Sequence, residues 1–173
     1  MREEQKTLMP RTLLLMRHAK SAYPPGVADH DRPLAPRGIR EARLAGHWLR
    51  GHAPRIDAVL CSTATRARET LSNTGVEAPA TFSDRLYGAV PGTVIDVING
   101  VDNSVDTLLV IGHEPVMGQV SLGLAGAADS SETAAQQIST KFPTSAIAVL
   151  RTDEPWSRLE PGAGALVGFH VPR

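Results

Sequence analysis

The chain has 173 residues, of which 42% are hydrophobic, a length and composition typical of one globular domain with a substantial core. Its 18 basic residues balance its 18 acidic residues, so the overall charge points to neither nucleic acid nor a membrane surface as a partner. The single cysteine, Cys61, excludes an internal disulfide, and the polar start MREEQK is unlike a signal segment, so we expect one cytoplasmic domain over residues 1–173.

The first part of the chain predicts a strand, a loop and a helix. The apolar run at 12–17 is typical of a buried strand. Four prolines lie between positions 21 and 36 and predict a surface loop there. A helix then begins near Arg37, and Gly51 is its expected stop.

The same alternation continues to the end of the chain. After a second strand at 57–61, we expect a helix that opens on a Ser or Thr and closes at Gly75. Further patterns predict strands at 80–83, 107–112, 145–151 and 165–171, and helices at 93–98 and 116–124. This order predicts a three-layer α/β fold: a mostly parallel sheet with helices on both faces and a late antiparallel addition.

Polar side chains follow three of the predicted strands at the point where each strand ends. Arg17 and His18 end the first strand, Arg66 lies one helical turn beyond the second, and His113 follows the strand at 107–112. Ligands of open α/β sheets bind beyond the carboxyl ends of the strands, where these side chains can meet. Two guanidinium groups and two imidazoles are the chemistry that a phosphoryl group requires, and a neutral imidazole can be the nucleophile.

The sequence also resembles the histidine phosphatase superfamily, whose fold is phosphoglycerate mutase-like. MRHAK at 16–20 resembles its Arg-His signature, STATRARET at 62–70 its second phosphate-binding segment, and GHEP at 112–115 its second histidine. DHDRPLAPRG at 29–38 and the short length are similar to the small branch typified by SixA phosphohistidine phosphatases. The stretch between the second and third motifs is too short for the large lid of the mutase branch, so we expect a compact molecule with an open site.

The resemblance implies a role for each matching residue. His18 would be the nucleophile that accepts the phosphoryl group, and Arg17, Arg66 and His113 would bind the phosphoryl oxygens. Lys20 and Ser21 directly follow His18 and are further candidates for phosphate contacts. The implied activity is that of a metal-independent phosphatase without a cofactor.

The general acid is less well marked than the nucleophile. The resemblance implies that enzymes acting on alcohol phosphates take this acid from the region after the second helix, where Asp84 is the nearest carboxylate. Glu114, which adjoins His113, is the other carboxylate near a motif. A phosphohistidine substrate demands less of an enzyme acid, because its imidazole can leave after ring protonation. We therefore expect a protein that carries phosphohistidine as the substrate and partner, with a small phosphate ester as the alternative.

Three other interpretations fit the sequence less well. Cys61 does not open the C-x5-R loop of thiol phosphatases, because Ala67 occupies the arginine position. The six histidines form no HExxH or H-x-H motif for a metal hydrolase. A silent phosphate-binding module would not need an intact His18 beside its arginines.

Overall fold

The computed structural model describes residues 10–126 and 128–173. The first nine residues, on which the prediction about a signal segment rests, lie outside the described part of the chain. Within that part, no helix is long and apolar enough to cross a membrane. That the chain forms a single domain stays a prediction.

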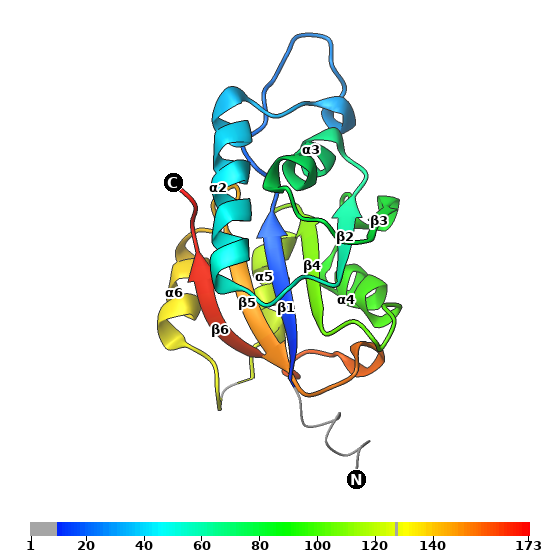
Figure 1. Cartoon of the computed structure of the whole chain (residues 1–173), viewed down its shortest axis with the longest axis vertical. Coiled ribbons are helices and arrows are strands. Elements are labelled where there is room, and N and C mark those ends of the chain that lie inside the picture. The colour runs from blue at the N-terminus through cyan, green and yellow to red at the C-terminus, as the bar shows by residue number, and fades with distance from the viewer. Residues whose placement is uncertain (1–9, 127) are drawn as a thin grey trace.

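A six-stranded sheet forms the middle layer, in the order β3-β2-β4-β1-β5-β6 (Figure 1). Its first four strands in that order are parallel, β5 is antiparallel to β1, and β6 is antiparallel to β5. The predicted sheet with its antiparallel addition is therefore confirmed. The strands are β1 (Arg11–Arg17), β2 (Ala58–Ser62), β3 (Ala80–Ser83), β4 (Thr107–Gly112), β5 (Ile147–Thr152) and β6 (Ala165–His170).

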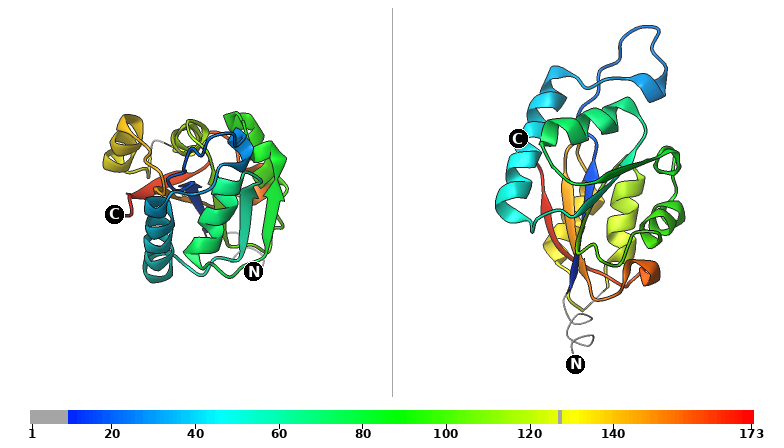
Figure 2. Two further views of the ribbon diagram at one scale, coloured as in Figure 1. Left: turned by 90° about the horizontal axis from the view of Figure 1, so that it is seen from above. Right: turned by 45° about the vertical axis from the view of Figure 1, so that its right-hand side comes forward.

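Helices cover both faces of the sheet, as Figure 2 (left) shows from above. One face carries α2 (Pro36–His52) and α3 (Thr65–Thr74), and the other carries α4 (Pro91–Asn99), α5 (Val116–Leu124) and α6 (Glu132–Thr140). Short 3-10 turns lie at η1 (Asp29–Asp31), η2 (Asp84–Leu86) and η3 (Trp156–Arg158). These three layers match the predicted architecture.

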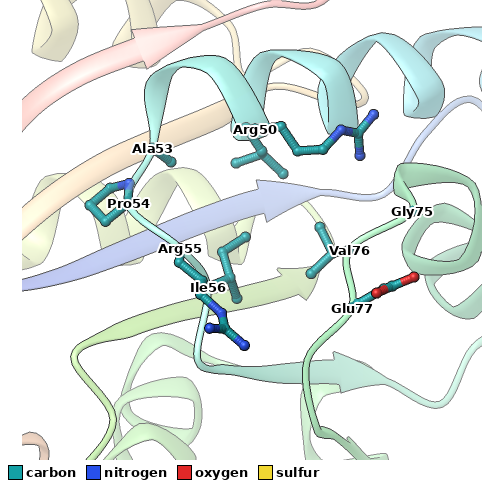
Figure 3. Close-up of a pocket in the computed structure, with 9 residues that line it drawn as sticks. Arg50, Ala53, Pro54, Arg55, Ile56, Gly75, Val76 and Glu77 are labelled. Atoms are coloured by element: carbon teal, nitrogen blue, oxygen red, sulfur yellow. The ribbon is translucent and has the colours of Figure 1, made fainter.

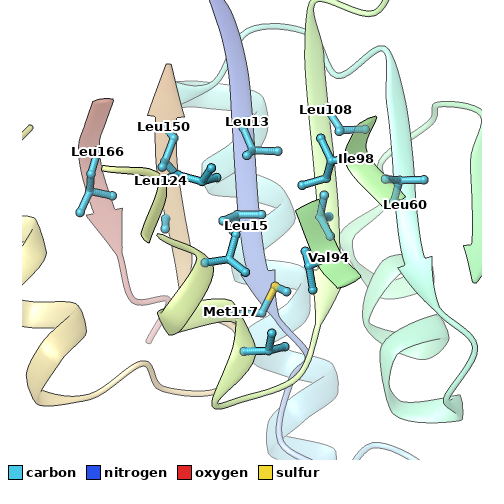
Figure 4. Close-up of a cluster of buried hydrophobic side chains, with 14 of the residues drawn as sticks. Leu13, Leu15, Leu60, Val94, Ile98, Leu108, Met117, Leu124, Leu150 and Leu166 are labelled. Atoms are coloured by element: carbon cyan, nitrogen blue, oxygen red, sulfur yellow. The ribbon is translucent and has the colours of Figure 1, made fainter. Parts of the chain in front are cut away.

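The strand sequences explain how both faces become buried. Successive side chains of a strand point to opposite faces, so a central strand covered on both sides is apolar throughout. In β1, Leu13 and Leu15 pack into the cluster under α4 and α5 (Figure 4), whereas Leu14 and Met16 pack under α2 and α3. Because β1 is packed on both faces, the position of its carboxyl end is fixed within the core.

Three details differ from the sequence-based expectations. Helix α2 runs past Gly51 to His52, because the helix stop is Ala53, held extended by the proline that follows it. Helix α3 begins after Ala64, which makes no side-chain cap, although Gly75 closes it in the left-handed conformation as predicted. Helix α6 was not predicted, because its described residues bury only Ala134 and Ile138 and give a weak apolar pattern.

The carboxyl ends of β1, β2 and β4 lie at one edge of the sheet, the upper edge in Figure 1, and the loop after β1 rises above it. Strand β5 starts at this same edge, since Ile147 pairs with Met16 near the end of β1. The segment just before β5 thereby joins the three predicted strand ends.

Candidate active site

The four side chains that the sequence places at strand ends line one cavity of about 200 Å³. The two histidine rings lie 5.1 Å apart between centroids. Lys20 and Ser21, the two further candidates, also line it, so the structure brings together every predicted phosphate-contact residue. The complete lining is Arg17, His18, Lys20, Ser21, Tyr23, Arg32, Arg66, His113, Glu114 and Thr144.

The tautomer of His18 follows from one hydrogen bond. Its Nδ1 lies 2.7 Å from the carbonyl oxygen of Ala19. A carbonyl can only accept, so Nδ1 carries the proton and donates it. The lone pair is therefore on Nε2, the atom that a nucleophilic imidazole uses.

The tautomer of His113 follows in the same way from Ser62. Ser62 Oγ accepts a hydrogen bond from the amide of Ala64 and lies 2.8 Å from His113 Nε2. Ser62 is fully buried and its hydroxyl has no other neighbour to donate to among the described residues, so we assign it as the donor to His113 Nε2. The proton of His113 is then on Nδ1, which makes Nδ1 a donor.

Three buried donors of the site have no hydrogen-bond partner among the described residues. They are Nε of Arg17, Nε of Arg66 and Nδ1 of His113. A buried unpaired donor costs about 1–3 kcal/mol, so three around one small cavity indicate a place built to receive an anion.

Both arginines of the cavity are held by the protein, Arg17 through one outer nitrogen and Arg66 through both. Arg17 Nη1 donates to the carbonyl of Phe142 at 3.0 Å, in the segment before β5. Arg66 Nη1 donates to the Asp29 carbonyl at 2.7 Å, and its Nη2 donates to the Asp29 carboxylate at 3.1 Å. The Tyr87 hydroxyl also donates to that carboxylate. Both guanidinium groups are thus fixed before any substrate binds.

Sequence reasoning missed Asp29 and Tyr87. The hydrogen bond from Tyr87, together with those from Arg66 and Arg32, holds the pKa of the Asp29 carboxyl well below its usual range, so it stays ionised. The DHDRP segment contains Asp29, but nothing in its spacing indicates a contact with Arg66. Only the folded loop after β1 brings the two together.

Burial and positive charge keep both histidines of the cavity neutral. Burial lowers the pKa of His18 to about 3, helped by the neighbouring His113, Arg66 and Arg17. Burial, Arg66 and Arg17 lower the pKa of His113 to about 4. At neutral pH, Nε2 of His18 is therefore free to attack an electrophile.

The backbone around His18 is tied to α3 and α2. Thr70 Oγ1 accepts from the Ala19 amide at 2.9 Å and donates to the Arg66 carbonyl at 2.6 Å, which links the segment after His18 to Arg66. A Cβ at Gly38 would lie 2.1 Å from the Lys20 carbonyl, so only glycine allows α2 to approach this segment. Both contacts hold the relative positions of the site residues.

The two candidate acids lie in different places. Asp84 does not line the cavity: it is exposed and accepts a hydrogen bond from Thr63 Oγ1 at 2.5 Å. Glu114 does line it, and one of its oxygens accepts from the Gly118 amide at 2.6 Å. Burial raises the pKa of Glu114, which favours a protonated carboxyl.

Other chemistry in the described part of the chain is less suited to catalysis. Burial raises the pKa of the Cys61 thiol to about 12, so it is not a nucleophile at neutral pH. No three His, Cys, Asp or Glu side chains in this part are grouped as metal ligands.

A larger hollow of about 560 Å³ lies between the end of α2, the start of β2 and the segment after α3 (Figure 3). Its described lining includes Arg50, Arg55 and Glu77 but no histidine, cysteine, serine or threonine. Arg50 is also engaged, since it donates to the Thr74 carbonyl at 2.7 Å. The reactive groups are therefore in the smaller cavity, despite its size.

Known proteins share this fold and sequence. The sequence model of the histidine phosphatase superfamily (branch 1) matches residues 13–93. An uncharacterized protein of Mycobacterium tuberculosis is 64% identical over 91% of this chain and 100% of its own length. The Escherichia coli phosphohistidine phosphatase SixA is 31% identical over 82% of this chain and 86% of that protein. A solved structure assigned to SixA of Nakamurella multipartitia is 38% identical, with a TM-score of 0.87 over 94% of this chain and 96% of that one.

The three-layer fold and the convergent arginines and histidines define a hydrolase of the phosphatase class. With the similarity just described, the chain belongs to the histidine phosphatase superfamily, in its SixA-like branch.

Proposed function

We propose that the protein is a metal-independent phosphatase that removes phosphoryl groups from histidine on a partner protein, through a phosphohistidine intermediate on His18. The observation that carries this proposal is the fixed tautomer of His18, whose free Nε2 lies in a cavity with three unpartnered donors. That the protein acts in the cytoplasm, and that neither nucleic acid nor a membrane is its partner, stay predictions.

The reaction has two displacements. Nε2 of His18 attacks phosphorus, the bond from phosphorus to the substrate imidazole breaks, and that imidazole leaves as the neutral ring after protonation. Water then attacks the phosphoryl group on His18, the bond to Nε2 breaks, and inorganic phosphate is released. Arg17, Arg66 and His113 stabilise the charge on the equatorial oxygens in both steps, which is the main task in phosphoryl transfer.

The size of the cavity supports a substrate carried on a larger molecule. Its volume of about 200 Å³ is below the ~300–1,000 Å³ of common small-molecule sites, so it holds a phosphoryl group and little more. The absence of Asp84 from the lining also favours phosphohistidine, whose imidazole needs less help from an acid than an alkoxide does.

The test is phosphate release, with EDTA present, from a histidine-phosphorylated phosphotransfer domain and from an aryl phosphate. We expect the phosphoprotein to be cleared with a kcat/KM on the order of 10²-fold higher, because a protein substrate can make contacts around the small cavity that an aryl phosphate is too small to make. Turnover of the aryl phosphate alone would favour the ester phosphatase, and loss of both activities in EDTA would contradict a metal-independent mechanism.

One observation favours the second candidate, a small-molecule phosphomonoesterase. Glu114 lies at the cavity with a raised pKa, and the oxygen not bonded to Gly118 can hold the proton that an alkoxide needs.

Glu114→Gln should separate the two candidates. If the protein acts on phosphohistidine, this variant should keep phosphoprotein turnover within about twofold, while alkyl phosphate turnover falls by roughly 10²-fold with the loss of a general acid. Glutamine can still accept from the Gly118 amide, so the start of α5 stays capped. Asp84→Asn is the matched control and should change neither rate. Equal losses on both substrates in Glu114→Gln would show that Glu114 supports the structure of the site and is not a general acid.

A further inference from the structure

Tyr23 combines two properties that rarely occur together. It lines the catalytic cavity, yet 73% of its surface is exposed. A large aromatic side chain in this position leaves apolar surface in water unless something covers it. Tyrosine is also enriched where proteins bind one another, because its ring gives a large contact area at low entropic cost.

The ring of Tyr23 is held in place before any partner binds. The Arg32 guanidinium lies 4.1 Å from the ring centroid. Arg32 is fixed in turn by Ser21 Oγ at 2.8 Å and by the Asp29 carboxylate at 3.1 Å. The ring therefore rests on a cation that belongs to the same network as Arg66.

The loop that carries Tyr23 is also constrained. Its base is closed by the bridge between Ser21 and Leu34 and by the bond from the Ala22 amide to the Pro33 carbonyl at 2.8 Å. Its tip is a turn in which the Val27 amide donates to the Pro24 carbonyl, with a proline followed by Gly26 at positive φ. Prolines at the tip reduce the entropy that binding would cost.

The apolar surface of this loop extends beyond the cavity. Val27 at the tip is 39% exposed and does not line the cavity. In Figure 1, and from another direction in Figure 2 (right), the loop projects above the carboxyl ends of the strands. A ligand that touches both the bottom of the cavity and Val27 must be larger than the cavity itself.

We infer that the loop segment Tyr23–Val27 is the surface that binds the phosphorylated partner protein, with Tyr23 packed against apolar side chains beside the partner's phosphohistidine. This inference rests on the proposed function and adds the kind of partner: a folded protein with an apolar patch around the phosphorylated residue. Lys20, exposed and 5.9 Å from the Tyr23 ring, adds positive charge on the approach of the phosphoryl group.

The experiment compares two substrates that share the same leaving group: a histidine-phosphorylated phosphotransfer domain and the free amino acid phosphohistidine. Val27→Asp should lower kcat/KM for the protein by about tenfold or more and leave free phosphohistidine unchanged, because only the protein reaches Val27. Tyr23→Ala should lower the ratio of kcat/KM for the phosphoprotein to kcat/KM for free phosphohistidine by at least as much. Tyr23→Phe should preserve that ratio. Val90→Ala, at an exposed apolar residue on another loop, is the control and should change neither rate.

The outcomes separate the inference from the proposed function. If wild type turns over both substrates and the ratio is unchanged in both Val27→Asp and Tyr23→Ala, the loop is not the docking surface. If wild type hydrolyses neither substrate, the proposed function is wrong and the inference is overturned with it. Retained turnover of free phosphohistidine by the variants shows that they are folded.

Discussion

His18→Ala is expected to abolish phosphate release from a phosphoprotein, with kcat/KM falling by on the order of 10⁴-fold or more. The variant keeps the two arginines and His113, so it can still bind phosphate, but it lacks the Nε2 of His18 that forms the covalent intermediate. A loss of kcat with little change in phosphate affinity is the signature of a missing nucleophile.

The intermediate should also be directly visible in the wild-type enzyme. Incubation with a phosphoryl donor and rapid quenching in alkali should leave phosphate bound to the peptide that contains His18, as the N–P bond of phosphohistidine survives alkali and is lost in acid. Because the pKa of His18 is lowered to about 3, its neutral form persists as the pH falls through 6.5. The ring signals of His18 in NMR should therefore not titrate between pH 8 and 5.

The control for this prediction is His47→Ala, which changes an exposed histidine of α2 and should leave the rate unchanged. Phosphate release that survives in His18→Ala would remove His18 from the mechanism. Phosphate trapped on a peptide containing His113 instead would reverse the roles of the two histidines.

The part of the site that was predictable from sequence depends on strand topology. Arg17 ends β1, His18 and His113 directly follow β1 and β4, and Arg66 lies in the first turn of α3 after β2. These strands have a clear burial pattern, and the carboxyl ends of neighbouring parallel strands lie on the same side of the sheet. Alternating strands and helices form parallel strands, whose carboxyl ends share that side. The convergence of these residues therefore follows from that alternation.

The rest of the site depends on contacts that no local pattern marks. Asp29 and Tyr23 lie on a loop whose path is set by its own hydrogen bonds and by Arg32. Thr144 reaches the cavity because β5 runs antiparallel and starts beside the end of β1, a pairing that becomes visible only in the fold. Asp84 is the carboxylate nearest to the region after the second helix, where the resemblance places an acid, but β3 is an outermost strand of the sheet and Asp84 does not line the cavity.

Arg66→Ala is expected to lower kcat by roughly 10²–10³-fold, the usual effect of removing one donor to a developing negative charge. Both outer nitrogens of Arg66 donate to Asp29, and its Nε is buried without a partner among the described residues. Arg66→Lys should recover little of this rate, because one ammonium group cannot both bind Asp29 and donate into the cavity. The measurement is kcat and KM with the phosphoprotein, together with the Kd of inorganic phosphate.

Arg68 provides a control within the same helix. It lies two residues from Arg66 but is exposed, with its guanidinium 5.3 Å from the Phe82 ring centroid, so Arg68→Ala should leave kcat within about twofold of wild type. Equal losses in the two variants would mean that general positive charge, rather than a specific contact from Arg66, supports the reaction. A large loss confined to Arg66→Ala, with phosphate affinity also reduced, would show that Arg66, rather than Arg68, is the arginine of α3 that takes part in catalysis.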